Sequence, residues 1–218
     1  MRIIPNRILI LICLVGASVY AASLIASEAS LQAKAHIEYS QKPGTEIISF
    51  REIFPEFADQ DPTPLIRIYN DGRVVVFHPS YMKQAGQYEM MMPRNELDEL
   101  LLRLTPALMD FDPEQVRMQK KASDEMLWAS TPDWKEITLF HDSDAEISVF
   151  QVNIDAYYPN GKQGPKISKP NLERSWRGLR FDARDYSGIE SIQSLMQVER
   201  SLKALARHGA LVRVESPQ

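Results

Sequence analysis

Two short runs of β-branched and aromatic residues flank a glycine turn, at residues 65–69 and 73–77. The turn residues are Asn70-Asp71-Gly72, and Gly72 can adopt the positive φ that closes a tight β-hairpin. A three-residue loop with Gly72 as a bulge would put Ile66, Ile68, Val74 and Val76 on one face, and Arg67, Tyr69, Arg73, Val75 and Phe77 on the other. A two-residue loop would instead group Ile66, Ile68, Val75 and Phe77. We favour the first register because it directs both arginines outward.

The same stretch contains Asp71 and His78, which could suggest an active site. Asp71 lies at the tip of the turn and His78 near the end of a strand, about five residues or ~16 Å apart at the usual rise per residue. They cannot form a catalytic pair within this hairpin. We interpret Asp71 as a turn residue and His78 as a strand-end residue.

The hairpin is followed by a predicted strand at residues 87–92 and by an amphipathic helix. Five leucines of that helix form one apolar stripe: Leu97, Leu100, Leu101, Leu104 and Leu108. Asn95 and Asp98 resemble a capping arrangement at its start. The three methionines of the strand alternate between its faces, which indicates core packing rather than a metal-binding surface.

A second helix is predicted to begin at Asp112-Pro113, with Asp112 as the N-cap residue. Its apolar stripe is poor, so we expect it to lie on the surface. A second hairpin is predicted around the turn at residues 141–145. The carboxylates there, Asp142, Asp144 and Glu146, lack the glycine and the terminal glutamate of a calcium-binding EF-hand loop, which favours solvated turn residues.

The last third of the chain predicts a short strand at "GLRF", residues 178–181, and a helix over residues 189–205. Gly209 is placed as a C-terminal stop, and residues 211–214 return as a strand. Together the elements predict an α+β fold in which antiparallel sheet hairpins pack against amphipathic helices.

We divide the chain into four predicted parts. They are a signal peptide or N-terminal membrane anchor (1–27), an N-terminal extension (28–64), a first α+β unit (65–128) and a second α+β unit (129–218). Hairpin, strand and helix occur in both units, and Ile66 and Ile137 hold corresponding places. Two related hairpin-strand-helix units are therefore one alternative, and two unrelated α+β segments are the other.

The amino terminus predicts export. Arg2 and Arg7 precede an uncharged run at residues 8–27, which is aliphatic first and then rich in small residues, as in a secretory signal. Cleavage before Ala22 would release the body, but a run of this length also suffices to span a membrane, so an uncleaved anchor is the alternative. Both versions place the body outside the cytoplasm, periplasmic or anchored facing the periplasm.

Charge and cysteine content exclude several function classes. The chain has 25 Lys+Arg and 29 Asp+Glu, and losing the two leader arginines would leave 23 against 29, a net charge of −6. This balance argues against nucleic-acid binding. The single cysteine, Cys13, lies in the leader, so the body has no disulfide, thiol nucleophile or thiolate metal site.

The first unit, "IRIYNDGRVVVFHP" followed by "GQYEMMMPRNELDELLLRL", resembles a hairpin-strand-helix module of uncharacterised exported bacterial proteins. The resemblance covers about 45 residues and implies architecture and export. It supplies no activity and no functional residues.

No catalytic motif occurs in the sequence. There is no Gly-x-Ser-x-Gly, glycine-rich phosphate loop or His-Glu-x-x-His, and the histidines, at positions 36, 78, 141 and 208, are far apart. We expect no cofactor and no metal. The leading hypothesis is a non-catalytic binding or assembly protein of the cell envelope, and the alternative is an exported hydrolase whose site forms from residues distant in sequence.

The segment from Tyr157 to Tyr186 is the predicted contact for a partner, another envelope protein or an anionic ligand. It is rich in proline and glycine, and long connections of this kind are often functional. Its tyrosine, tryptophan and arginine side chains are the types that dominate binding interfaces; the candidates are Tyr157, Tyr158, Arg174, Trp176, Arg177 and Arg180. In the competing interpretation, Glu173, Asp182 and Asp185 neutralise the arginines, while Trp176 and Phe181 anchor the segment to the core.

Overall fold

The computed structural model describes residues 35–56, 62–130, 145–168 and 171–214. The described residues divide into two units, a smaller one with residues 35–36 and 158–166 and a larger one with the described residues from 37 to 157 and from 167 to 214. In the smaller unit the rings of His36 and Tyr158 lie 5.9 Å apart. Two short strands, β1 (His36–Glu38) and β7 (Ala156–Tyr158), pair with each other. Apart from His36 and Tyr158, the residues of these two strands belong to the larger unit, as do all the other described elements.

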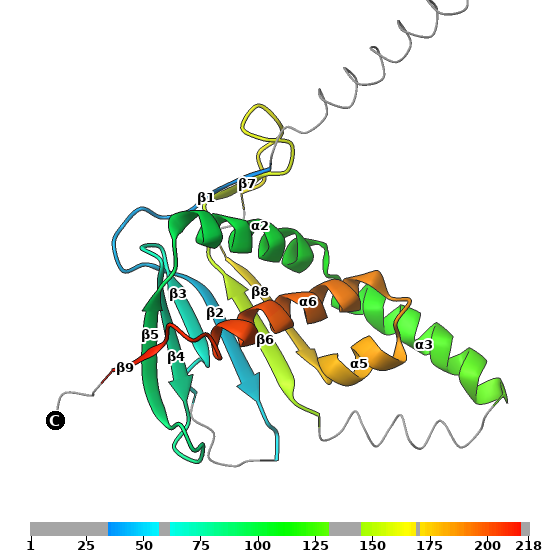
Figure 1. Ribbon diagram of the computed structural model, residues 1–218. Helices are drawn as coiled ribbons and strands as arrows, with labels where there is room; N and C mark the ends of the chain where they lie inside the picture. Colours follow the sequence, from blue (N-terminus) through cyan, green and yellow to red (C-terminus); the bar gives the residue numbers. More distant parts are fainter. Residues whose placement is uncertain (1–34, 57–61, 131–144, 169–170, 215–218) are drawn as a thin grey trace, which may run out of the picture. The chain divides into compact units, whose positions relative to one another are not determined.

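The larger unit is built on a seven-stranded sheet in the order β8-β6-β2-β3-β4-β5-β9, in which every pair of neighbours is antiparallel (Figure 1). Its strands are β2 (Glu46–Ile53), β3 (Ile66–Tyr69), β4 (Arg73–His78), β5 (Gly86–Met91), β6 (Ile147–Val152), β8 (Leu172–Arg177) and β9 (Val212–Val214). The described helices are α2 (Arg94–Asp110), α3 (Pro113–Ser130), α5 (Leu179–Asp185) and α6 (Glu190–Leu205). The predicted α+β class is confirmed.

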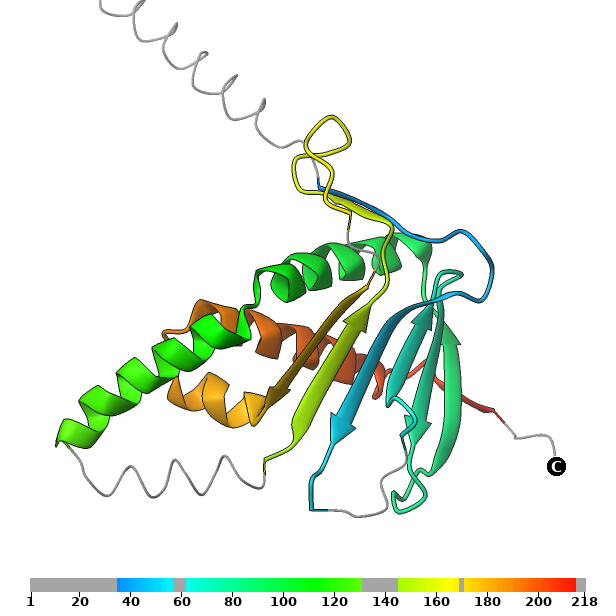
Figure 2. The same cartoon turned by 180° about the vertical axis from the view of Figure 1, so that it is seen from behind.

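The helices α2, α5 and α6 lie on one face of this sheet in both views (Figures 1 and 2). Alternate residues of the strands point to this face. Phe50 of β2 is opposite Phe150 of β6, with ring centroids 5.2 Å apart, and both side chains are fully buried. α2 packs against β6 and β8, and each of its five predicted leucines is buried.

The first hairpin has the register that we favoured. Ile66 is opposite Val76 and Ile68 opposite Val74, all four fully buried. Gly72 has a φ of +89°, and its carbonyl oxygen accepts a 2.8 Å hydrogen bond from the backbone N–H of Met92. The turn therefore anchors the chain that leads from β5 into α2.

Several other local predictions are confirmed. The strand at residues 87–92 is β5, the C-terminal helix is α6, and the returning strand is β9, which pairs with β5 at the edge of the sheet. Asp112 caps α3 as predicted, because its Oδ1 accepts the backbone N–H groups of Glu114 and Gln115 at 2.9 and 3.3 Å. Only Val116 and Asp124 of α3 are buried, so this helix lies on the surface.

Two local predictions are wrong. Residues 178–181 do not form a strand, because Gly178 has a φ of +66° and starts α5. Asn95 and Asp98 do not cap α2, which has no side-chain hydrogen bond at its N-cap residue, Pro93. Asp98 instead accepts a 2.8 Å hydrogen bond from the hydroxyl of Tyr39.

The sheet combines strands from three of the four predicted parts. β2 comes from the extension at 28–64, and it lies between β3 of the first unit and β6 of the second. The first strand and the turn of the predicted second hairpin, together with Asp142 and Asp144, lie outside the described residues. The internal duplication therefore stays a prediction.

The predicted signal or anchor at 1–27 also lies outside the described residues. Among the helices that the structure describes, none has the length and apolar character needed to cross a membrane.

Candidate binding groove

The predicted contact residues take different positions. Trp176 is 6% exposed, and its ring lies edge-on to Phe111 with centroids 5.3 Å apart. Arg174 donates from Nε to the backbone carbonyl of Phe111 at 3.1 Å. These two side chains fasten β8 to the junction between α2 and α3, as the competing interpretation proposed for Trp176.

The other four candidates are two exposed arginines, a buried tyrosine and a tyrosine of the smaller unit. Arg177 ends β8 and is exposed, and Arg180 is exposed on α5 with its guanidinium 5.8 Å from the centre of the Phe181 ring. Tyr157 is buried, and Tyr158 belongs to the smaller unit. The structure therefore does not gather the six residues on one surface of the larger unit, and their role in binding stays a prediction.

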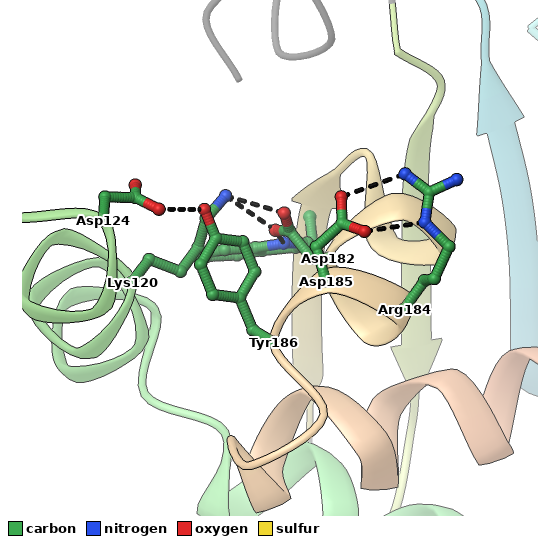
Figure 3. A network of polar contacts seen from close by, with 7 residues as sticks. Lys120, Asp124, Asp182, Arg184, Asp185 and Tyr186 are labelled. Atoms are coloured by element: carbon green, nitrogen blue, oxygen red, sulfur yellow. Dashed lines mark hydrogen bonds and ion pairs between the residues drawn. The ribbon is translucent and has the colours of Figure 1, made fainter. Parts of the chain in front are cut away.

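A buried polar network joins α3 to α5 (Figure 3). Lys120 Nζ lies 2.8 and 2.9 Å from the two carboxylate oxygens of Asp182. Asp182 also accepts a 2.6 Å hydrogen bond from Trp176 Nε1, and Asp124 accepts one of 2.6 Å from the Tyr186 hydroxyl. The buried carboxylates thus have partners, which is typical of a structural network.

A second buried cluster lies between the sheet and α6. Glu199 is 1% exposed and accepts hydrogen bonds from Ser148 Oγ at 2.6 Å and from Lys203 Nζ at 2.7 Å. Burial alone would lower the pKa of Lys203, but hydrogen bonds to Glu199 and Glu52 raise it above its ordinary value. Lys203 is therefore protonated at neutral pH and cannot act as the general base for Ser148.

His78 offers no catalytic arrangement either. Burial lowers the pKa of its imidazole, and its ring packs edge-on against Tyr88 with centroids 5.5 Å apart. No group of three or more His, Cys, Asp or Glu side chains that could hold a metal ion occurs within the described ranges.

A groove of about 850 Å³ lies between α2, α3 and α6. Its volume falls in the range of small-ligand sites. The following residues line it: Leu100, Leu102, Arg103, Leu104, Pro106, Ala107 and Asp110 of α2; Gln115 and Gln119 of α3; and Glu190, Ser191, Gln193, Ser194, Gln197, Val198 and Ser201 of α6.

The groove has an apolar floor and a polar rim. Leu100, Leu104 and Val198 are buried at its floor. The rim consists of exposed charged and amide side chains: Arg103, Asp110, Gln115, Gln119, Glu190 and Gln197. None of these six side chains makes a hydrogen bond or an ion pair with another side chain or with the backbone in the part of the chain that the structure describes. Their donors and acceptors are available to a ligand.

One end of the groove is acidic. α2 begins after β5 and α6 ends before β9, which is the neighbour of β5, so the two helices run in opposite directions (Figure 1). The last residue of α2, Asp110, and the first of α6, Glu190, therefore lie at the same end. The pKa of Tyr157 is raised by burial and then by the charge of Asp110, which places this predicted residue near the acidic end.

Comparisons with known proteins do not identify a family for the chain. Neither a family model, nor a curated protein, nor a solved structure matches it. Function therefore has to be inferred from the groove itself.

Sequence reasoning missed the groove because serine and glutamine at outer helix positions are typical of a solvated face. One signal was present. Pro106 lies in the middle of an otherwise regular leucine-rich helix, and a proline at such a position removes a helical hydrogen bond.

Proposed function

We propose that the protein is a non-catalytic binding protein of the cell envelope, which holds an extended peptide segment of a partner protein in the groove between α2, α3 and α6. The observation that carries the proposal is an open groove with an apolar floor and a rim of unpartnered polar side chains. An apolar centre surrounded by polar groups is the usual composition of a protein-binding surface.

The polar groups of the rim suit a peptide backbone. Glutamine side chains carry both a donor and an acceptor, as a peptide group does. From Glu190 to Ser201 the groove follows α6 for about 16 Å at 1.5 Å per residue. That length accommodates about five residues of extended chain at 3.3 Å each, with alternate side chains directed to the leucine floor.

The buried polar clusters support a binding role rather than hydrolysis. Ser148 is inaccessible to solvent and donates to a carboxylate, while the neighbouring lysine is held protonated by two glutamates. A serine nucleophile requires an accessible hydroxyl and a neighbouring base that can accept its proton.

The groove is tested by panning a phage-displayed random heptapeptide library on the full chain in a mild detergent. We expect enriched peptides whose synthetic forms bind at least about tenfold more weakly to Ala107→Trp, because the indole would fill the groove. Ala122→Trp is the matched control, since Ala122 is exposed on α3 outside the groove and its replacement should leave binding unchanged.

Two results would count against the groove. One is binding that survives in a folded Ala107→Trp variant but is lost when Arg174, Arg177 and Arg180 are all replaced by alanine, which would move the site to the segment predicted from sequence. The other is binding of oligosaccharides on a glycan array with no peptide enriched.

The location of the protein in the cell envelope is supported by the uncharged run at residues 8–27, which follows Arg2 and Arg7. Fractionation of cells with intact-mass measurement should find the body outside the cytoplasm, either without residues 1–21 or with the whole run retained as an anchor. Recovery of the full-length chain in the cytoplasmic fraction would contradict this part of the proposal.

A further inference from the structure

One row of α2 gives the groove a defined hydrogen-bonding character. Leu102, Pro106 and Asp110 all line the groove. They are four residues apart, so they follow one side of the helix over about 12 Å. Pro106 lies inside α2 and has no N–H, so the carbonyl of Leu102 lacks the donor that the fourth following residue supplies in a regular helix.

The polar groups of this row are acceptors. They are the carbonyl oxygen of Leu102 and the carboxylate of Asp110, and Glu190 adds a second carboxylate from α6 at the same end. Arg103 also lines the groove, but it precedes Asp110 by about 10 Å along the helix axis. Helical side chains tilt toward the N-terminus, so Arg103 is directed away from this end. The complementary ligand group is therefore one that only donates.

We infer that the peptide bound in the groove carries a lysine or arginine side chain, which is received by Asp110 and Glu190, while a backbone N–H of the same peptide, further along the groove, donates to the carbonyl oxygen of Leu102. The ammonium and guanidinium groups have several N–H donors and no acceptor, as this end of the groove requires. The inference rests on the proposed peptide-binding function and adds the chemistry of the partner segment.

The charge preference is measured with the peptides enriched on the wild-type chain. We expect a basic residue at one fixed position, and affinity about 2- to 5-fold lower when that residue is replaced by glutamine in the synthetic peptide. Asp110→Asn should weaken binding of the basic peptide and reduce the difference between the two peptides, because Glu190 is then the one remaining carboxylate of the pair. Glu99→Gln, a matched change at an exposed residue of α2 outside the groove, should retain that difference.

The role of the freed carbonyl is tested by Pro106→Ala. Alanine supplies the missing N–H, so the carbonyl of Leu102 becomes engaged within the helix, and the basic peptide should bind about 2- to 10-fold more weakly. The midpoint of thermal unfolding should stay the same or rise, because proline disfavours a helix interior. Weaker binding in a variant of equal or greater stability separates a role in binding from one in folding.

The possible failures are distinguishable. Enriched peptides without a basic residue, or a Pro106→Ala variant that binds as the wild type does, would overturn this inference and leave the groove intact as a peptide site. If no peptide is enriched by the wild-type chain, the proposed function and the inference both fall.

Discussion

Replacing Asp182 by alanine is expected to lower the free energy of unfolding by about 3–5 kcal/mol, the cost of breaking a buried ion pair from one side. The side chain of Asp182 is 5% exposed and that of its partner Lys120 is 13% exposed. Without the Asp182 carboxylate, the Lys120 ammonium and the Trp176 indole N–H each lose one hydrogen-bond acceptor. Denaturant unfolding of the wild type and the variant measures the difference.

Loss of the ion pair between Lys120 and Asp182 should also disturb the groove. α3 buries only Val116 and Asp124, so the contact between Lys120 and Asp182 is a main attachment of this helix to the rest of the unit. Gln115 and Gln119 of α3 form one wall of the groove. Asp182→Ala should therefore also weaken peptide binding, although Asp182 does not line the groove.

A neighbouring carboxylate provides the control. Asp185 of the same helix pairs with Arg184, whose side chain is 63% exposed, so Asp185→Ala should leave the free energy of unfolding nearly unchanged. In a double-mutant cycle, Lys120→Met and Asp182→Ala should be coupled by about 0.5–3 kcal/mol. Additive effects of the two changes would show that the ion pair does not stabilise the attachment of α3.

Replacing Gly72 by alanine should lower the free energy of unfolding by about 2–4 kcal/mol, because two costs combine there. The residue has a φ of +89°, which side-chain-bearing residues rarely adopt, and an added Cβ would lie 2.3 Å from the backbone oxygen of Met92. A backbone atom between β5 and α2 cannot move without disturbing both elements. The loss is measured by chemical denaturation.

A substitution at Gly44 distinguishes the cost of backbone strain from the cost of the Cβ clash. It also has a positive φ, +72°, but an added Cβ would have no heavy atom within 4 Å. Gly44→Ala should therefore show only the backbone strain, about 1 kcal/mol. Equal losses in the two variants would mean that the contact with Met92 is not part of the cost.

The sequence predicted those elements whose signals lie within a few neighbouring residues. The register of the first hairpin follows from the alternation of aliphatic and polar residues around Gly72, and α2 follows from its leucine spacing. The strand predicted at "GLRF" was wrong because leucine and phenylalanine two residues apart suit a strand as well as a short helix. These residues belong to α5, which is stabilised by the hydrogen bonds that Asp182 and Tyr186, four residues apart, make with α3.

The arrangement that creates the groove could not be predicted in the same way. Its lining residues come from three helices, and nothing local indicates that their polar sides lie together. Buried Asp124 and Asp182 were missed for the same reason, since a charged residue in a helix is usually solvated. Pro106 was visible in the sequence, but its effect depends on which side of α2 the freed carbonyl occupies.

The central position of β2 has a consequence for the order of folding. Ile48 pairs on one side with Ile68 and on the other with Val152, about a hundred residues further along the chain. During synthesis the amino-terminal part emerges first. The strands from β2 through β5 can therefore form their part of the sheet, and α2 can pack on it, long before β6 has been synthesised. During that interval β2 is an edge strand with a free row of N–H and C=O groups beside the uncovered Phe50, a template for pairing with another molecule. The half-emerged chain is therefore the species most in need of a chaperone.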